Sequence, residues 1–312
     1  MKLTANDVSI LVAVARYYVL SAAMIHRICF PGRKDGRHTR RRLLELTQLG
    51  LLRKSAVNVA FSVGNAGPAY SPANGGVEAL ATYFNDDSWL SVNTRPPRLD
   101  RLYHWLDISW THSIIHRACQ QSQTTKLVQW INEWQPLRDA DDNPSNFVLH
   151  TQFRESPPLS CSPDAAFLLQ VGNHFRVVYV EVDRGTSGAR RIAASKTPGF
   201  KEALITQNHR RHFPQTTEED FSILLIAIDR NHRDRIQREV SQMTDKHPEL
   251  WLFCSRDEFT PEAALFGNIY IDHEGTAGPL ICGGAESANV STNAAVSNTP
   301  RTLLQQEGSH VE

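Results

Sequence analysis

The sequence Pro163-Asp-Ala-Ala-Phe-Leu-Leu169 is followed by the polar break Gly172-Asn-His174 and then by Arg176-Val-Val-Tyr-Val-Glu-Val-Asp-Arg-Gly-Thr186. The second apolar run is rich in β-branched and aromatic residues and lies between glycine-containing turns, which is typical of a strand. The first run is equally apolar and is separated from the second by a short turn. Together the two runs predict a β-hairpin.

The predicted hairpin carries acidic residues at the ends of its strands. Glu181 and Asp183 lie two residues apart, so on a strand both side chains point to the same face. The hairpin register would bring Asp164, at the start of the first strand, towards this pair. Three clustered carboxylates suit a hard divalent cation such as Mg²⁺ or Mn²⁺. The alternative interpretation is that they are ordinary strand-end carboxylates facing solvent.

These residues also carry a resemblance to known proteins. Pro163-Asp164 followed by Glu181-Val-Asp183 resembles the PD-(D/E)xK core of restriction-endonuclease-like folds. The longer string through Thr186, with Lys196 downstream, resembles the bacterial replication-relaxation proteins over roughly residues 1–275. That resemblance implies an N-terminal winged helix and an occurrence on plasmids and other mobile elements. The nuclease lysine is expected two residues after the glutamate, where this chain has Asp183, so enzymatic activity is left open.

The length of the chain and the distribution of its charges indicate domain number and a class of partner. The 312 residues, 41% hydrophobic and 21% charged, suffice for two globular domains. The net charge is zero, but the first sixty residues contain eleven Lys and Arg against three Asp and Glu. Such asymmetry indicates a nucleic-acid-facing end.

The five cysteines are single and lack the CxxC spacing of zinc or redox sites. They predict buried thiols in a reducing cytoplasm. The sequence shows neither a secretory signal pattern nor an apolar run of membrane-spanning length. We therefore expect a cytoplasmic protein without a membrane partner.

Residues 1–84 show the order of a winged helix-turn-helix domain. Apolar spacing and caps predict helices over 5–16, 22–30 and 36–49, with Thr4 or Asn6 and then Ser21 as N-caps. A β-wing is expected after the third helix, from the alternating residues 57–63 and the glycine turn 64–67.

The third predicted helix has the composition of a DNA recognition helix. Its basic residues crowd the N-terminal half, where such helices present side chains to the major groove of double-stranded DNA. A solvated basic face without a ligand is the alternative. The residues predicted to contact DNA are Arg33, Lys34, Arg37, Arg40, Arg41, Arg42 and Gln48.

Residues 85–135 are predicted to form a linker followed by a helical segment. The linker is polar and contains proline as far as Pro97, and the apolar spacing from Leu99 to Trp134 favours helix. His112 and His116 have the i, i+4 spacing of a helical metal pair. Because no glutamate or third ligand accompanies them, packed or surface histidines are the favoured interpretation.

Residues 136–282 predict an α/β domain, so that the whole chain is α+β. We expect a PD-(D/E)xK-like mixed sheet flanked by helices. The strands are expected at 147–153, in the hairpin, and at 221–228, 251–254 and 268–271. The helices are expected at 189–211, broken at Pro198-Gly199, and at 234–243. Residues 283–312 lack aromatic residues and predict a disordered tail.

Three functions are compatible with this sequence. The first is a DNA-binding protein of a plasmid or other mobile element, acting in replication or mobilisation. The second is a metal-dependent DNA nuclease in which Asp164 and Glu181 hold the cation, Asp183 assists and Lys196 stabilises charge on the phosphate. The third is a transcription regulator with a dimerisation domain. Replication or relaxosome proteins and a second copy of the chain are further candidate partners.

Overall fold

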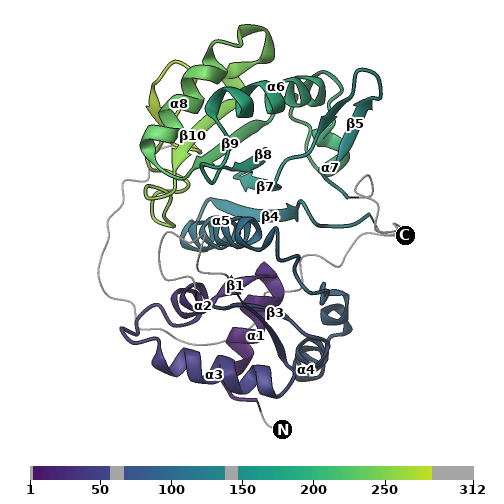
Figure 1. Cartoon of the computed structure of the whole chain (residues 1–312), viewed down its shortest axis with the longest axis vertical. Coiled ribbons are helices and arrows are strands. Elements are labelled where there is room, and N and C mark those ends of the chain that lie inside the picture. The colour runs from purple at the N-terminus through teal and green to yellow at the C-terminus, as the bar shows by residue number, and fades with distance from the viewer. Residues whose placement is uncertain (1–2, 57–66, 138–146, 283–312) are drawn as a thin grey trace. The chain divides into compact units, whose positions relative to one another are not determined.

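The computed structural model describes residues 3–56, 67–137 and 147–282 (Figure 1). The N-terminal part begins with the helices α1 (Ala5–Tyr17), α2 (Ala22–Cys29) and α3 (Arg37–Gln48). α1 begins at a capping box in which Thr4 and Asp7 exchange hydrogen bonds, and Ser21 caps α2. The three helices predicted from spacing and caps are therefore confirmed.

A three-stranded antiparallel sheet accompanies these helices. Its strands are β1 (Leu20–Ser21), β3 (Ala69–Pro72) and β2 (Leu52–Ser55), in that order. The helix α4 (Asn74–Phe84) and the 3₁₀ turn η2 (Asp87–Ser91) follow. Their apolar faces share one core with α1, α2 and α3. The predicted tip of the wing, at residues 57–66, lies outside the described residues.

The segment from Leu99 to Trp134 is only partly helical. α5 covers Leu102–Gln121, but Thr125–Asn132 forms the strand β4. The expectation of helix throughout was therefore wrong. β4 pairs in antiparallel fashion with the first strand of the predicted hairpin, and this pairing outweighs the helical spacing of its apolar residues.

The second part of the chain is organised around a mixed seven-stranded sheet of order β12-β11-β10-β9-β8-β7-β4. The predicted hairpin is present as β7 and β8, and β8, β9 and β10 run parallel to one another. The remaining pairs are antiparallel. The bounds of the strands not yet given are β7 (Ala165–Val171), β8 (His174–Val182), β9 (Ser222–Ala227), β10 (Trp251–Ser255), β11 (Tyr270–Ile271) and β12 (Ala277–Gly278). This architecture confirms the predicted α/β class.

Both faces of the sheet are buried. Residues of α5 pack against one face, where they share a core with alternate residues of β7, β8 and β9. α6 (Ala189–Ile205) and α8 (Arg230–Ser241) pack against the other face. Burial on both faces explains why β9 is a continuous apolar run. The elements that complete this part are the hairpin β5 (Thr151–Arg154) and β6 (Leu159–Cys161), α7 (His209–His212), η4 (Thr244–Lys246) and η5 (Pro248–Leu250).

α6 runs through Pro198 without the predicted break. Gly199, which follows Pro198, lies close to β6. A Cβ at this position would lie 2.3 Å from the carbonyl oxygen of Ser160. Glycine therefore allows α6 to contact the backbone of β6 directly. The break comes after Ile205 instead, before the short helix α7.

The cysteines and the helices bear on two further expectations. Cys119, Cys161 and Cys254 are buried as predicted, whereas Cys29 is half-buried and Cys282 is exposed. Among the described helices, none combines the length and the apolar character needed to cross a membrane. The predicted tail, residues 283–312, lies outside the described residues.

Candidate functional site

The pairing of β7 and β8 brings two of the predicted site residues together. Asp164 precedes β7, and its backbone amide donates to the carbonyl of Val180 in β8 at 3.0 Å. Its carboxylate oxygen Oδ2 accepts a hydrogen bond from the amide of Val182 at 2.7 Å. Glu181 lies between these two partners and is 5% exposed. The two acids therefore lie at the same end of the sheet.

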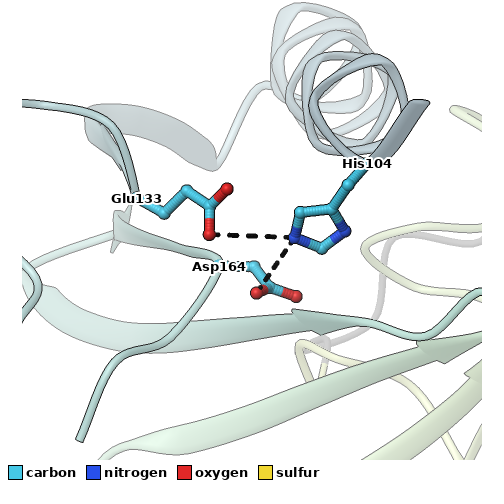
Figure 2. A group of neighbouring side chains, drawn as sticks. All are labelled: His104, Glu133 and Asp164. Carbon is cyan, nitrogen blue, oxygen red and sulfur yellow. Dashed lines mark ion pairs between the residues drawn. The ribbon is translucent and has the colours of Figure 1, made fainter. Parts of the chain in front are cut away.

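Two further residues, which the sequence pattern does not predict, join this end of the sheet. His104 is the third residue of α5, and Glu133 directly follows β4. Nε2 of His104 lies 3.1 Å from Oδ1 of Asp164 and 3.8 Å from Oε2 of Glu133 (Figure 2). Within the part of the chain that the structure describes, these three residues form one group whose side chains are placed to share a metal ion.

Neighbouring groups fix the orientation of the carboxylates. The amide of Glu133 donates to the carbonyl of Asp164 at 2.9 Å, so β4 and β7 hold the two acids next to each other. The indole Nε1 of Trp105 donates to Oε1 of Glu133 at 2.5 Å. Trp105 is the neighbour of His104 on α5, and it therefore couples the orientation of Glu133 to the helix that carries the histidine.

Lys196 enters the same site from α6, on the other face of the sheet. Its Nζ lies 2.6 Å from Oε2 of Glu181 and donates to the carbonyl of Ser162 at 3.2 Å. The sequence predicts Lys196 as a substitute for the lysine of the nuclease motif. It reaches Glu181 from α6 and not from the strand that carries the glutamate. The structure thus brings Asp164, Glu181 and Lys196 together.

Opposite charges and burial shift the pKa values in this site. Burial would raise the pKa of Asp164, but the charges of His104 and Lys196 lower it to about 2. Burial would lower the pKa of His104, but Asp164 and the neighbouring glutamates raise it to about 9. Burial raises the pKa of Glu181 to about 8, against the charge of Lys196. Asp164 and His104 therefore form a charged pair at neutral pH.

Asp183 has different partners from the other predicted site residues. β8 ends at Val182, and the carboxylate of Asp183 accepts from the amide of Gly185 at 2.9 Å. The same oxygen lies 2.8 Å from Nε2 of His232 on α8. The structure does not place Asp183 in the group formed by His104, Glu133 and Asp164.

The predicted DNA-binding residues differ in exposure. The side chains of Arg37 and Arg41 are 86% and 68% exposed, and each contacts a carboxylate of its own segment. Arg42 is 22% exposed and pairs with Asp7, whose side chain is 1% exposed. Arg33, Lys34, Arg40 and Gln48 are exposed.

The histidine pair on α5 is packed. His112 stacks on the ring of Trp130, with centroids 4.4 Å apart, and is 8% exposed. Nδ1 of His116 lies 2.6 Å from the hydroxyl of Tyr17 on α1. These contacts agree with the favoured interpretation of packed histidines.

The sequence contained one usable signal for the two residues that were missed. A strand assignment for β4 would have placed Glu133 at the end of a strand neighbouring β7, beside Asp164. His104 carried no such signal, since the spacing of α5 marks only its buried face.

Comparison with known protein families gives a match. Neither the curated proteins nor the solved structures contain a match to this chain. The family described as replication-relaxation matches residues 11–215, which is more than half of the 312 residues. The match includes the end of α1, the helices α2 and α3, α5, the hairpin and Lys196. The chain belongs to the replication-relaxation family, and this membership suggests a role in the replication or mobilisation of mobile elements.

Proposed function

We propose that the chain is a DNA-binding protein of a plasmid or other mobile element, which binds double-stranded DNA through a winged helix. The observation that carries this proposal is the exposed basic surface of α3 and the loop before it. Arg37 and Arg41 project from α3 into solvent, while Leu43 and Leu46 of the same helix are fully buried. The helix is thus fixed through one face and offers cations on another.

The surroundings of α3 support this proposal. α2 packs against α3, and the strands β2 and β3 follow, which is the order of a winged helix-turn-helix. The carboxylates beside the exposed arginines, Asp35 and Glu45, are themselves partly exposed. Such surface pairs contribute little free energy, so phosphates can replace the carboxylates as partners.

The test is a gel shift with duplex DNA and the variant Arg37→Glu/Arg41→Glu. We expect binding to be lost, because two cations near phosphates become anions. Arg238→Glu on α8 is the matched control, since it reverses one exposed charge on another surface. Unaltered binding by the folded double variant would overturn the proposal.

A second candidate function is metal-dependent nicking of DNA. The specific observation in its favour is the 2.6 Å contact between Nζ of Lys196 and Glu181, beside Asp164. When bound between such carboxylates, a divalent cation polarises a phosphate and lowers the pKa of water. In this arrangement Asp164 and Glu181 would hold the cation, and the ammonium of Lys196 would stabilise negative charge that develops on the phosphate.

Incubation of supercoiled plasmid with the purified protein and Mn²⁺ tests this second candidate. Nicking that disappears in Glu181→Gln, while duplex binding persists, would support it. Intact plasmid alongside normal DNA binding would refute it and leave the first function in place.

A further inference from the structure

We infer that His104, Glu133 and Asp164 bind one transition-metal ion, such as Mn²⁺, in preference to Mg²⁺. This inference rests on the second candidate function for its biological role and deepens it by naming the ion and by changing the ligands. His104 and Glu133 join Asp164 as ligands, while Glu181 stays paired with Lys196. The inference is tested by binding alone. A negative result in the gel shift or the plasmid assay therefore does not decide whether the metal binds. Absence of metal binding, in turn, does not decide whether the protein binds DNA.

The distances among the three side chains suit a shared ion. Metal–nitrogen and metal–oxygen bonds of about 2.0–2.2 Å place two ligands of one ion roughly 3.0–4.3 Å apart. Nε2 of His104 lies 3.1 Å from Asp164 and 3.8 Å from Glu133, inside that range. All three ligand atoms lie within 4.8 Å of one another.

Each carboxylate of the group has one oxygen held by a protein donor. Oδ2 of Asp164 accepts from the amide of Val182, which leaves Oδ1 towards His104. Oε1 of Glu133 accepts from the indole of Trp105, which leaves Oε2 towards the same imidazole. Figure 2 shows the two carboxylates directed at one nitrogen. Donors of this kind orient metal ligands in known sites.

Glu181 supplies an independent observation. Its Oε2 pairs with Lys196, but its Oε1 is buried and has no hydrogen-bond partner among the described residues. A buried carboxylate oxygen without a partner costs free energy unless a cation or donor approaches it. Glu181 lies between Val180 and Val182, which both hydrogen-bond to Asp164, so the unpartnered oxygen belongs to a side chain next to one of the proposed ligands.

The ligand set selects the class of ion. Mg²⁺ prefers oxygen ligands and several waters, whereas an imidazole nitrogen suits first-row transition metals such as Fe²⁺ and Zn²⁺ better. Two carboxylates with one histidine therefore favour a first-row transition metal. With three protein ligands, the remaining coordination positions would be left for water or a phosphate oxygen.

The experiment is a titration of the full chain with Mn²⁺ and with Mg²⁺ by calorimetry, followed by pulsed EPR of the Mn²⁺ complex. We expect one Mn²⁺ per chain, a Kd for Mn²⁺ at least about tenfold lower than that for Mg²⁺, and a ¹⁴N coupling from the imidazole. His104→Gln should abolish the coupling and raise the Kd for Mn²⁺ at least about tenfold, because loss of a residue that only orients a metal ligand already costs about 10–100-fold in affinity.

Further variants keep the test decisive if one of them does not fold. Glu133→Gln should weaken Mn²⁺ binding, while Asp183→Asn should leave it unchanged because Asp183 pairs with His232. His174→Gln, at the exposed other end of β8, is the matched histidine control. Equal Kd values for the two ions, no ¹⁴N coupling, or unchanged binding by folded His104→Gln would overturn the inference.

Discussion

Replacing Arg42 by alanine should destabilise the protein, although Arg42 lies on the same helix as the proposed DNA-binding arginines. Its Nε and Nη2 donate to Oδ1 of Asp7 at 2.8 and 2.6 Å. Asp7 belongs to α1, and its side chain is 1% exposed. The pair therefore joins α3 to the start of α1. Its guanidinium also contacts Glu45.

The structure gives the size of this effect. Removal of one partner from a buried ion pair costs about 3–5 kcal/mol. Asp7 keeps its hydrogen bonds from Thr4, and Arg42 is 22% exposed to water, so we expect a smaller loss of about 2–3 kcal/mol. At about 2–4 °C for each kcal/mol, Tm should fall by about 4–12 °C.

Urea unfolding of the wild type, Arg42→Ala and Arg41→Ala measures this prediction. Arg41 is 68% exposed, so its replacement should change the free energy of unfolding by less than about 0.5 kcal/mol. The reasoning is refuted if Arg42→Ala is as stable as the wild type, or if Arg41→Ala is the less stable of the two.

Three other predictions concern packing, pH and the candidate metal site. Gly199→Ala should lower the free energy of chemical unfolding by about 3 kcal/mol, because its Cβ would lie 2.3 Å from a carbonyl oxygen of β6. Gly188→Ala is the control, since its Cβ would meet no atom within 4 Å. Burial, aided by an arginine of α1, lowers the pKa of His116 from 6.5 to about 4. Between pH 6.5 and about pH 4, His116 therefore binds a proton in the unfolded chain but not in the folded chain. The free energy of unfolding should fall by about 3 kcal/mol as the pH drops through this range. Unfolding at several pH values should show that His116→Gln flattens this dependence. Trp105→Phe removes the donor to Glu133 and should weaken Mn²⁺ binding about tenfold, measured by calorimetry, with unchanged affinity counting against the site.

Local signals in the sequence were sufficient for the hairpin and for the first three helices. The turn at Gly172 separates two apolar runs, and caps at Thr4 and Ser21 mark the starts of α1 and α2. The convergence of Asp164 and Glu181 follows from the hairpin register, which sequence also predicts. These features depend on residues that are close along the chain.

The remainder of the candidate site depends on contacts that are distant along the chain. β4 is a strand because β7 offers it a partner, and Glu133 reaches the site only through that pairing. The orientation of α5 on the sheet, which places His104, has no local signature. Asp183 was predicted to share the face of Glu181, but β8 ends before it, and the turn at Gly185 directs its carboxylate to other partners.

The salt dependence of duplex binding tests the central claim most directly, because it counts the phosphate contacts made by the exposed arginines of α3. Binding of a labelled duplex should be measured by fluorescence anisotropy over a range of salt concentrations. Each phosphate contact contributes about −0.9 to the slope of log K against log salt. We predict that Arg37→Ala/Arg41→Ala makes the slope shallower by about 1.8 while the free energy of unfolding stays within about 1 kcal/mol of the wild type. A slope equal to that of the wild type would contradict the proposal that α3 binds the DNA backbone.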